Sequence, residues 1–187
     1  NTKEWFVGGT VSQKGQKIFD NEINEFKPEQ TKKYFRNMKW ETIVGFQTRN
    51  IPHFGHEKII HRMLDHCDHL VINPVFGPKK SGDATLQCLE NVFSNFYHNQ
   101  FSGRVTFKPI MANMFYAGPR EAIHHSLMRK KLGFDLFSVG RDHAGASGIY
   151  APDAAVNAVK RFSRTLGINV FCHSGAVFCR SCDRVIL

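Results

Sequence analysis

Short apolar runs alternate with longer amphipathic stretches from residue 40 onward. The runs have the length of buried strands and lie at residues 42–46, 69–75, 104–110, 134–140 and 168–172. The amphipathic stretches between them predict helices near residues 55–67, 83–99, 119–133 and 151–167. Strands that alternate with helices in this way form right-handed βαβ units. We therefore expect an α/β fold with a Rossmann-like, doubly wound parallel sheet.

The first 38 residues differ from the rest of the chain because they are polar and rich in lysine. Within them, residues 5–11 predict one strand, and residues 26–35 predict a short helix that opens after Pro28. Such a segment is too small to bury a core alone. We expect an N-terminal arm over residues 1–38 and one domain over residues 39–187. No apolar run approaches the length of a membrane span, and the opening residues lack the pattern of a secretory signal.

The charge balance favours anionic partners. The sequence has 25 Lys and Arg against 16 Asp and Glu, a net charge of +9. The basic residues are scattered, and aromatic residues such as Phe134 and Phe137 fall in predicted core strands instead of forming a stacking surface. We therefore expect phosphate-bearing metabolites or oxyanions as partners, with no nucleic acid and no membrane. The five cysteines are an odd, unevenly spread set, which favours a reducing cytoplasm over a secreted disulfide framework.

The stretch GFQTRNIPHFGHE holds the densest polar cluster in the chain. It follows the first predicted strand and opens the first long helix, where α/β proteins place their phosphate-binding loops. At the start of that helix, His53 and His56 would share one face, beside unsatisfied backbone N–H groups and the positive end of the helix dipole. Gln47, Arg49 and Asn50 precede the helix, and the Arg49 guanidinium suits a tetrahedral oxyanion. A capped helix start with surface histidines is the less favoured alternative.

The motif GRDHAG closes the fourth predicted strand. Its backbone amides and Arg141 are suited to form a concave anion site. Alone, Arg141 and Asp142 would more often be a surface ion pair. However, ligands of doubly wound sheets bind at the carboxyl ends of the strands, where the Arg49 loop also lies. We therefore predict that the loops around Arg49 and Arg141 converge on one pocket.

Four segments occur in an order that resembles the sulfate adenylyltransferase, or ATP sulfurylase, family. They are GFQTRNIPHFGHE, VINPVFGPKKSGD, AGPREAIHH and GRDHAG, and the resemblance runs from about residue 26 to residue 182. It implies a catalytic domain with a nucleotidyltransferase fold of the HxGH type. It also implies that the arm over residues 1–38 is a remnant of the family's β-rich N-terminal domain.

The resemblance implies a role for each residue of the site. Sulfate would be held by Gln47, Arg49, Arg141 and the amide of Ala144. The residues facing the ATP phosphates would be Thr48, Asn50, His53 and His56, which with Arg49 form the catalytic group. The ribose and adenine would lie along Gly140, Asp142, His143 and Ala176. Gln47, Arg49 and Arg141 would contact ATP as well as sulfate.

The activity that the resemblance implies is transfer of the adenylyl group of ATP to sulfate. A sulfate oxygen would attack the α-phosphorus in line, giving adenylyl sulfate and pyrophosphate. Mg²⁺ is expected on the ATP phosphates from general phosphate chemistry. Relatives are commonly homo-oligomers, so a homo-oligomer is an open possibility here.

Two further pairs of residues in the predicted helix at 119–133 are candidates for metal binding or catalysis. Arg120 and Glu121 lie in the first turn of a predicted helix, where a structural ion pair is expected. The adjacent His124 and His125 would point to different faces of that helix, which argues against a shared metal site.

A second metal candidate lies near the end of the sequence. Cys179 and Cys182 have metal-ligand spacing, and a zinc ion there would need Cys172 and His173 or other ligands to complete it. Reduced free thiols are the simpler alternative.

An alternative function keeps the fold and drops catalysis. The family usually has arginine where this sequence has Phe115, and many relatives continue past the Cys179–Cys182 pair to further ligands and phosphate-binding residues. On this basis the chain would be a catalytically impaired nucleotide- or oxyanion-binding module. Binding of ATP without release of pyrophosphate would favour this alternative.

Overall fold

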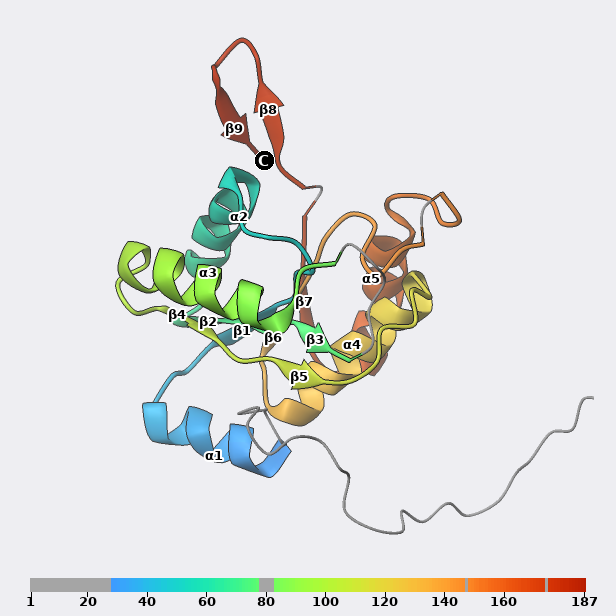
Figure 1. Ribbon diagram of the computed structural model, residues 1–187. Coiled ribbons are helices and arrows are strands. Elements are labelled where there is room, and N and C mark those ends of the chain that lie inside the picture. Colours follow the sequence, from blue (N-terminus) through green and yellow to red (C-terminus); the bar gives the residue numbers. More distant parts are fainter. Residues whose placement is uncertain (1–27, 78–82, 147, 174) are drawn as a thin grey trace, which may run out of the picture.

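A five-stranded parallel sheet forms the centre of the structure, a computed structural model that describes residues 28–77, 83–146, 148–173 and 175–187. Its strands run in the order β4-β2-β1-β6-β7 (Figure 1). Their bounds are β1 (Ile43–Phe46), β2 (His69–Ile72), β4 (Val105–Phe107), β6 (Leu136–Val139) and β7 (Asn169–Cys172). The strand order reverses at β1, so the crevice for a ligand lies beyond the carboxyl ends of β1 and β6. This confirms the predicted doubly wound α/β fold.

Helices cover both faces of the sheet. They are α1 (Pro28–Met38), α2 (Phe54–Leu64), α3 (Leu86–Gln100), α4 (Pro119–Leu132) and α5 (Ala154–Leu166). One core contains α2 and α3 with Val44 of β1, and the other contains α1, α4 and α5 with Ile43 of the same strand. Alternate strand residues point to opposite faces, so a strand buried on both sides is apolar throughout, as the sequence of β1 is.

Two of the predicted strands are interrupted in the structure. The run at 69–75 ends as β2 and resumes after Pro74, and the run at 104–110 ends as β4 and resumes after Pro109. Proline has no N–H to donate to the ladder, which ends both strands at corresponding places. The resumed segments pair in parallel as a separate two-stranded sheet, β3 (Val75–Phe76) with β5 (Ile110–Met111).

The helix expected after Pro28 is present as α1, and it contributes to the core. Phe35 is buried, and its ring meets that of Phe134 edge to face with centroids 5.0 Å apart. Just after the helix, Trp40 stacks on His69 of β2. The strand expected at residues 5–11 lies outside the described residues.

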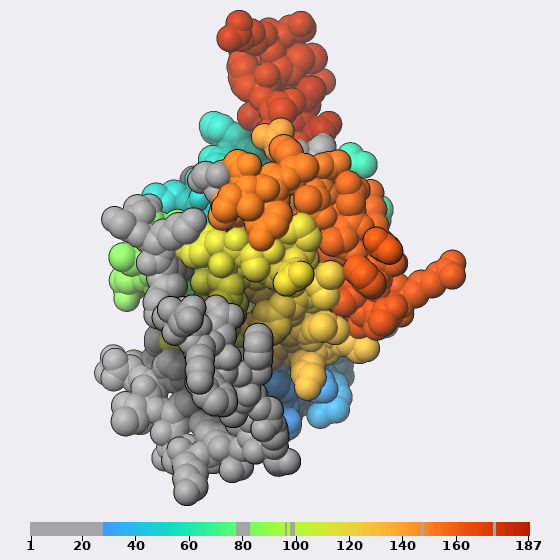
Figure 2. Space-filling view, turned by 90° about the vertical axis from the view of Figure 1, so that its right-hand side faces the viewer, coloured from blue at the N-terminus to red at the C-terminus, as the bar shows by residue number. Residues whose placement is uncertain are grey.

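A hairpin that the sequence pattern did not predict follows β7. Its strands β8 (Val177–Cys179) and β9 (Arg184–Ile186) pair antiparallel and project from the body of the molecule (Figures 1 and 2). Each strand has three residues, too few to give an alternating pattern. Among the helices that the structure describes, none combines the length and apolar character that a membrane crossing requires.

Candidate active site

A cavity of about 160 Å³ lies at the carboxyl ends of β1 and β6, where the sheet order predicts the ligand crevice. The loop after β1 with the start of α2, and the loop after β6, supply most of its walls. The predicted site residues that line it are Gln47, Thr48, Arg49, Asn50, His56, Gly140, Arg141, Asp142, His143 and Ala144. The loops around Arg49 and Arg141 therefore border the same cavity.

Two predicted site residues lie beside the cavity instead of lining it. The His53 side chain is exposed, and Ala176 follows β7 on the way to the hairpin. Both approach the start of α2 closely. A Cβ atom added to Gly55 would lie 2.8 Å from Cε1 of His53 and 3.1 Å from Cβ of Ala176. A side chain at position 55 would therefore displace the His53 ring.

Other lining residues were not predicted as part of this site. His173 comes directly after β7, and applying the strand-end rule to that strand would have found it. The sulfur of Met114 accepts a hydrogen bond from Nε2 of Gln47, at a distance of 3.7 Å. Phe46, Ile59 and Ser138 complete the wall of the cavity. Apart from their positions near a strand end or helix start, nothing in the sequence around them indicates that they line a cavity.

His56 is held in the wall of the cavity by Thr48. Its Nε2 lies 3.1 Å from Oγ1 of Thr48, which also accepts a hydrogen bond from the backbone N–H of Asn50. Burial, with smaller contributions from the neighbouring His53 and His173, lowers the pKa of His56 to about 4. The ring is therefore neutral at pH 7. Its Nδ1 is buried and has no hydrogen-bond partner among the described residues.

His53 caps the start of α2. Its Nδ1 accepts a hydrogen bond from the N–H of Gly55, and its backbone carbonyl accepts from the N–H of His56 at 2.8 Å. The sequence predicted unsatisfied amides at this helix start. This prediction is wrong for the amide of Gly55, because the side chain of His53 accepts its hydrogen bond.

Arg49 is positioned by two neighbours. Its guanidinium carbon lies 5.2 Å from the centre of the Tyr116 ring, and its Nη1 lies 3.9 Å from Oδ1 of Asp83. The Tyr116 hydroxyl in turn donates to Oδ2 of Asp83. A cation held over an aromatic ring at the mouth of a polar cavity is well placed to meet an anion.

The turn after β6 has the irregular backbone expected of a binding loop. Asp142 and Ala144 both have positive φ angles, +53° and +51°, which are uncommon outside glycine. The N–H of Asp142 donates to Pro152, and the N–H of Gly145 donates to Asp142. Within the described residues, no hydrogen bond is found for the N–H of Ala144, a residue that lines the cavity.

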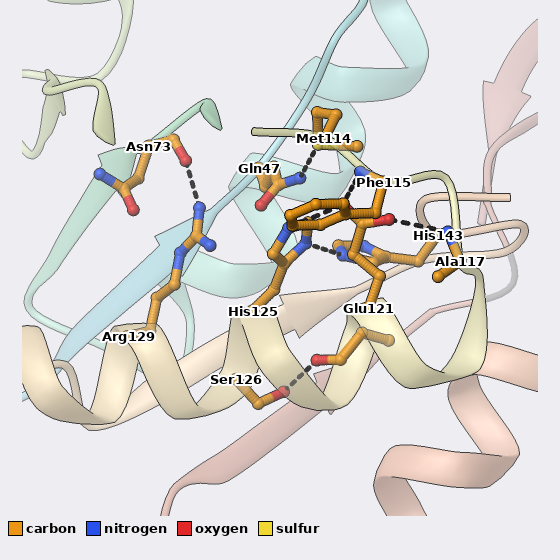
Figure 3. Close-up of polar contacts among 11 residues, drawn as sticks. Gln47, Asn73, Met114, Phe115, Ala117, Glu121, His125, Ser126, Arg129 and His143 are labelled. Carbon is orange, nitrogen blue, oxygen red and sulfur yellow. Dashed lines mark hydrogen bonds and ion pairs between the residues drawn. The ribbon is translucent and has the colours of Figure 1, made fainter. Parts of the chain in front are cut away.

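A buried polar chain lies behind the cavity and reaches α4 (Figure 3). Nε2 of His143 lies 3.0 Å from Nδ1 of His125, and Nε2 of His125 lies 3.3 Å from Oε1 of Glu121. Glu121 also accepts hydrogen bonds from the backbone N–H groups of Phe115 and Ala117, both at 2.9 Å. We expected Glu121 to form an ion pair with Arg120. Instead, Glu121 contacts His125 and the two backbone amides, and Arg120 is exposed.

The structure offers little support for a zinc site. In the described part of the chain, no three His, Cys, Asp or Glu side chains are grouped to hold a metal. Cys179 and Cys182 are neighbours in the hairpin, where hydrogen bonds from Cys182 lower the pKa of the Cys179 thiol. His173, considered as a further ligand, lines the cavity instead. All five cysteines are free of disulfides.

These features together define a doubly wound α/β domain with a fold of the HxGH nucleotidyltransferase type. The parallel sheet has its polar cavity at the switch point, and the His-x-Gly-His start of α2 borders that cavity. A family model for ATP-sulfurylase matches residues 24–186. The chain belongs to the ATP-sulfurylase family, as the resemblance predicted.

Curated relatives agree with this family. The sulfate adenylyltransferase of Thermococcus onnurineus is 41% identical over 192 residues, and that of Staphylothermus marinus is 38% identical over 188 residues. Each comparison covers 98% of this chain and 48% of the relative. The chain thus spans about half the length of these relatives.

Solved structures support the fold. A hexameric APS kinase from Thiobacillus denitrificans is similar with a TM-score of 0.64 at 14% identity, over 87% of this chain and 30% of that chain. A pantoate-beta-alanine ligase from Francisella tularensis, complexed with beta-gamma ATP and beta-alanine, has a TM-score of 0.52 at 13% identity, over 85% of this chain and 68% of its own. At these identities the similarity shows the fold alone.

Proposed function

We propose that this chain carries the active site of an enzyme that transfers the adenylyl group of ATP to sulfate, releasing pyrophosphate and forming adenylyl sulfate. The observation that carries the proposal is the single cavity bordered by the Arg49 loop, the Arg141 loop and the start of α2. Membership in the ATP-sulfurylase family and the names of the relatives support it.

The sulfate subsite is proposed at the four groups suited to a tetrahedral oxyanion: Gln47, Arg49, Arg141 and the amide of Ala144. All four residues line the cavity, and the amide has no competing partner among the described residues. Sulfate is fully ionised at neutral pH, so its oxygen needs no general base to attack the α-phosphorus. The protein's task is to position two anions that repel each other and to stabilise the charge of the transition state.

The ATP phosphates are proposed to face Thr48, Asn50, His53 and His56. His56 is neutral before the substrate binds, because burial lowers its pKa to about 4. It would then act as a neutral hydrogen-bond donor, and a bound triphosphate would raise its pKa by favouring the protonated ring. Mg²⁺ bound to the ATP phosphates would neutralise part of their charge.

The nucleoside is proposed to extend along Gly140, Asp142, His143 and Ala176. The cavity of about 160 Å³ is smaller than the roughly 300–1,000 Å³ that encloses a whole small ligand. It suits the reacting anions, which leaves the nucleoside to lie across the mouth toward Ala176 and α2.

The remaining expectations stay proposals. We propose an arm over residues 1–38 and a catalytic domain over 39–187, with α1 of the arm packed into the core. A cytoplasmic location and a homo-oligomer are likewise proposed. A zinc ion at Cys179 and Cys182 would need two more ligands than the described residues bring together there.

The test is release of pyrophosphate from ATP, measured in a coupled assay with and without sulfate. We expect release that depends on sulfate and is lost, by at least a hundredfold, in Arg49→Ala. Arg62→Ala, which removes an exposed arginine of α2 outside the cavity, is the matched control and should keep full activity. Binding of ATP without sulfate-dependent release would refute the proposed reaction and favour a binding module.

A further inference from the structure

Three buried side chains lie end to end behind the proposed nucleotide site. Glu121 and His125 stand one turn apart on α4, and His143 comes from the loop after β6 (Figure 3). Their exposed fractions are 2%, 0% and 9%, so water does not replace their mutual contacts. The contacts run from Oε1 of Glu121 to Nε2 of His125, and from Nδ1 of His125 to Nε2 of His143. Where the protons lie along this chain follows from counting donors and acceptors.

Glu121 is the fixed end of the chain. Its two oxygens accept hydrogen bonds from the N–H groups of Phe115 and Ala117. Nε2 of His125 approaches Oε1 of Glu121 to 3.3 Å without the geometry of a hydrogen bond. Burial works to raise the pKa of Glu121, but the adjacent His125 ring and the hydrogen bonds from the two backbone amides outweigh it, so the pKa is lowered. An ionised carboxylate donates no hydrogen bond. The nitrogen that faces it, Nε2 of His125, therefore carries a proton.

His125 is neutral, so it has only that one proton. Burial is the main cause that lowers its pKa to about 4, and the positive charge of Arg129, one turn further along α4, opposes a second proton. Glu121 acts in the other direction without overcoming these effects. Nδ1 of His125 is then an acceptor, and the hydrogen bond to His143 must be donated by Nε2 of His143.

His143 is neutral as well. Burial lowers its pKa well below the ordinary value, and His125, Arg129, His173 and Arg49 lower it further. With its proton on Nε2, the other ring nitrogen, Nδ1, carries a lone pair. Since Nε2 is occupied by His125, Nδ1 is the ring nitrogen that remains for a ligand in the cavity that His143 lines.

We propose that Glu121 and His125 are positioning residues, which fix His143 in the Nε2–H tautomer and make its Nδ1 a hydrogen-bond acceptor toward the cavity. Such an acceptor binds a hydroxyl or amino group. It repels the oxygens of sulfate and of the ATP phosphates, which carry no proton at neutral pH. This step rests on the proposed function. The group that donates to Nδ1 of His143 would belong to the nucleoside, and it is either a ribose hydroxyl or the adenine amino group. His143 would thereby keep the anions on the Arg49 side of the cavity.

The first test is a long-range ¹⁵N–¹H correlation spectrum of the histidine rings, recorded on the protein without substrate. The His143 signals are assigned by their loss in His143→Gln. We expect a protonated Nε2 and an unprotonated Nδ1 for His143. In His125→Phe, which removes the acceptor, the preference should be lost. His124→Gln changes the exposed neighbour on the same helix and should leave the His143 signals unchanged.

The second test compares nucleotides by calorimetry. ATP affinity should fall about threefold to tenfold in His125→Phe, the loss expected for one neutral hydrogen bond. Three analogues each lack one donor group: 2′-deoxy-ATP, 3′-deoxy-ATP and purine riboside triphosphate. The analogue that lacks the group recognised by His143 should bind the wild type about threefold to tenfold more weakly than ATP does. In His125→Phe, that analogue and ATP should bind with equal affinity. Equal losses for all analogues in both proteins would overturn the role of His143 as an acceptor.

The spectrum separates this proposal from the proposed reaction because no substrate is present. An Nδ1-protonated His143 in the wild type overturns the positioning role even where sulfate-dependent pyrophosphate release is intact. If His125→Phe does not fold, the wild-type spectrum still decides the tautomer.

Discussion

Lowering the pH should unfold this protein, because its buried histidines are neutral in the folded state. His56, His69 and His125 are each less than a tenth exposed, and burial lowers the pKa of each to about 4. In the unfolded chain the same rings have a pKa of about 6.5. The unfolded state therefore binds more protons between pH 6.5 and pH 4. The free energy of unfolding is therefore at its full value above pH 6.5, and it decreases as the pH falls toward 4.

The size of the effect follows from these values. Between pH 7 and pH 5, an unfolded ring takes up most of a proton and a folded ring almost none, which costs about 1.8 kcal/mol of unfolding free energy per ring. The three rings together cost about 5 kcal/mol, and His143, whose pKa is also lowered by burial, adds to the loss. A domain of this size is ordinarily stable by about 5–15 kcal/mol. The loss by pH 5 is therefore about a third or more of the stability at pH 7.

The assay is urea unfolding followed by circular dichroism at several pH values, without nucleotide or sulfate, since bound anions would stabilise the folded state. His69→Gln should reduce the slope of unfolding free energy against pH by about 1.2 kcal/mol per pH unit between pH 6 and 5. His69 lies outside the cavity, beside Trp40 and Thr106. His124→Gln makes the same substitution at an exposed position and serves as the control. An unfolding free energy constant to within about 1 kcal/mol from pH 7 to 5 would refute the reasoning.

Three further substitutions test the packing of the domain. Arg104→Ala removes a side chain that donates to three backbone carbonyls between the end of α2 and the start of β2, and it should lower the free energy of unfolding by about 1–2 kcal/mol in urea. Gly140→Ala would place a Cβ atom 2.6 Å from Cε1 of His173; we expect a displaced His173, about 1–3 kcal/mol less stability and weaker ATP binding by calorimetry. Phe35→Ala should cost about 3–5 kcal/mol if α1 is integral to the core, and a thermal midpoint within 2 °C of the wild type would show that this helix is dispensable.

The alternation of strands and helices predicted the fold because each strand of the sheet is buried on both faces. Such strands are nearly continuous apolar runs, like Ile43–Phe46, and they stand out from the amphipathic helices between them. The prolines after β2 and β4 lie inside apolar runs, so the sequence pattern did not show that the strands end there. The pairing of β3 with β5 shows that the two runs continue in a separate sheet. The three-residue strands of the final hairpin are too short to have a readable period.

The predicted residues that border the cavity include several that directly follow strand ends. Both Arg49 and Arg141 come from loops at the carboxyl ends of neighbouring strands, so the topology brings them to one cavity. His173 follows the same rule on β7, but its place next to Cys172 suggested a metal ligand first. Met114 could not be predicted in this way, since it lies in the loop after β5 and does not follow a strand of the central sheet in the sequence.

The role of His125 depends on information that its local sequence does not contain. From the sequence, His124 and His125 are equivalent neighbours that point to different faces of a helix, and this part of the prediction is consistent with one being exposed and the other buried. What distinguishes them is the partner that each face meets. The packing of α4 behind the loop after β6 places His125 between a carboxylate and His143, and that arrangement leaves one consistent distribution of protons. The chemistry of the loop is then set by a residue on the helix behind it, so variation at Glu121 or His125 should alter nucleotide recognition while leaving every lining residue in place.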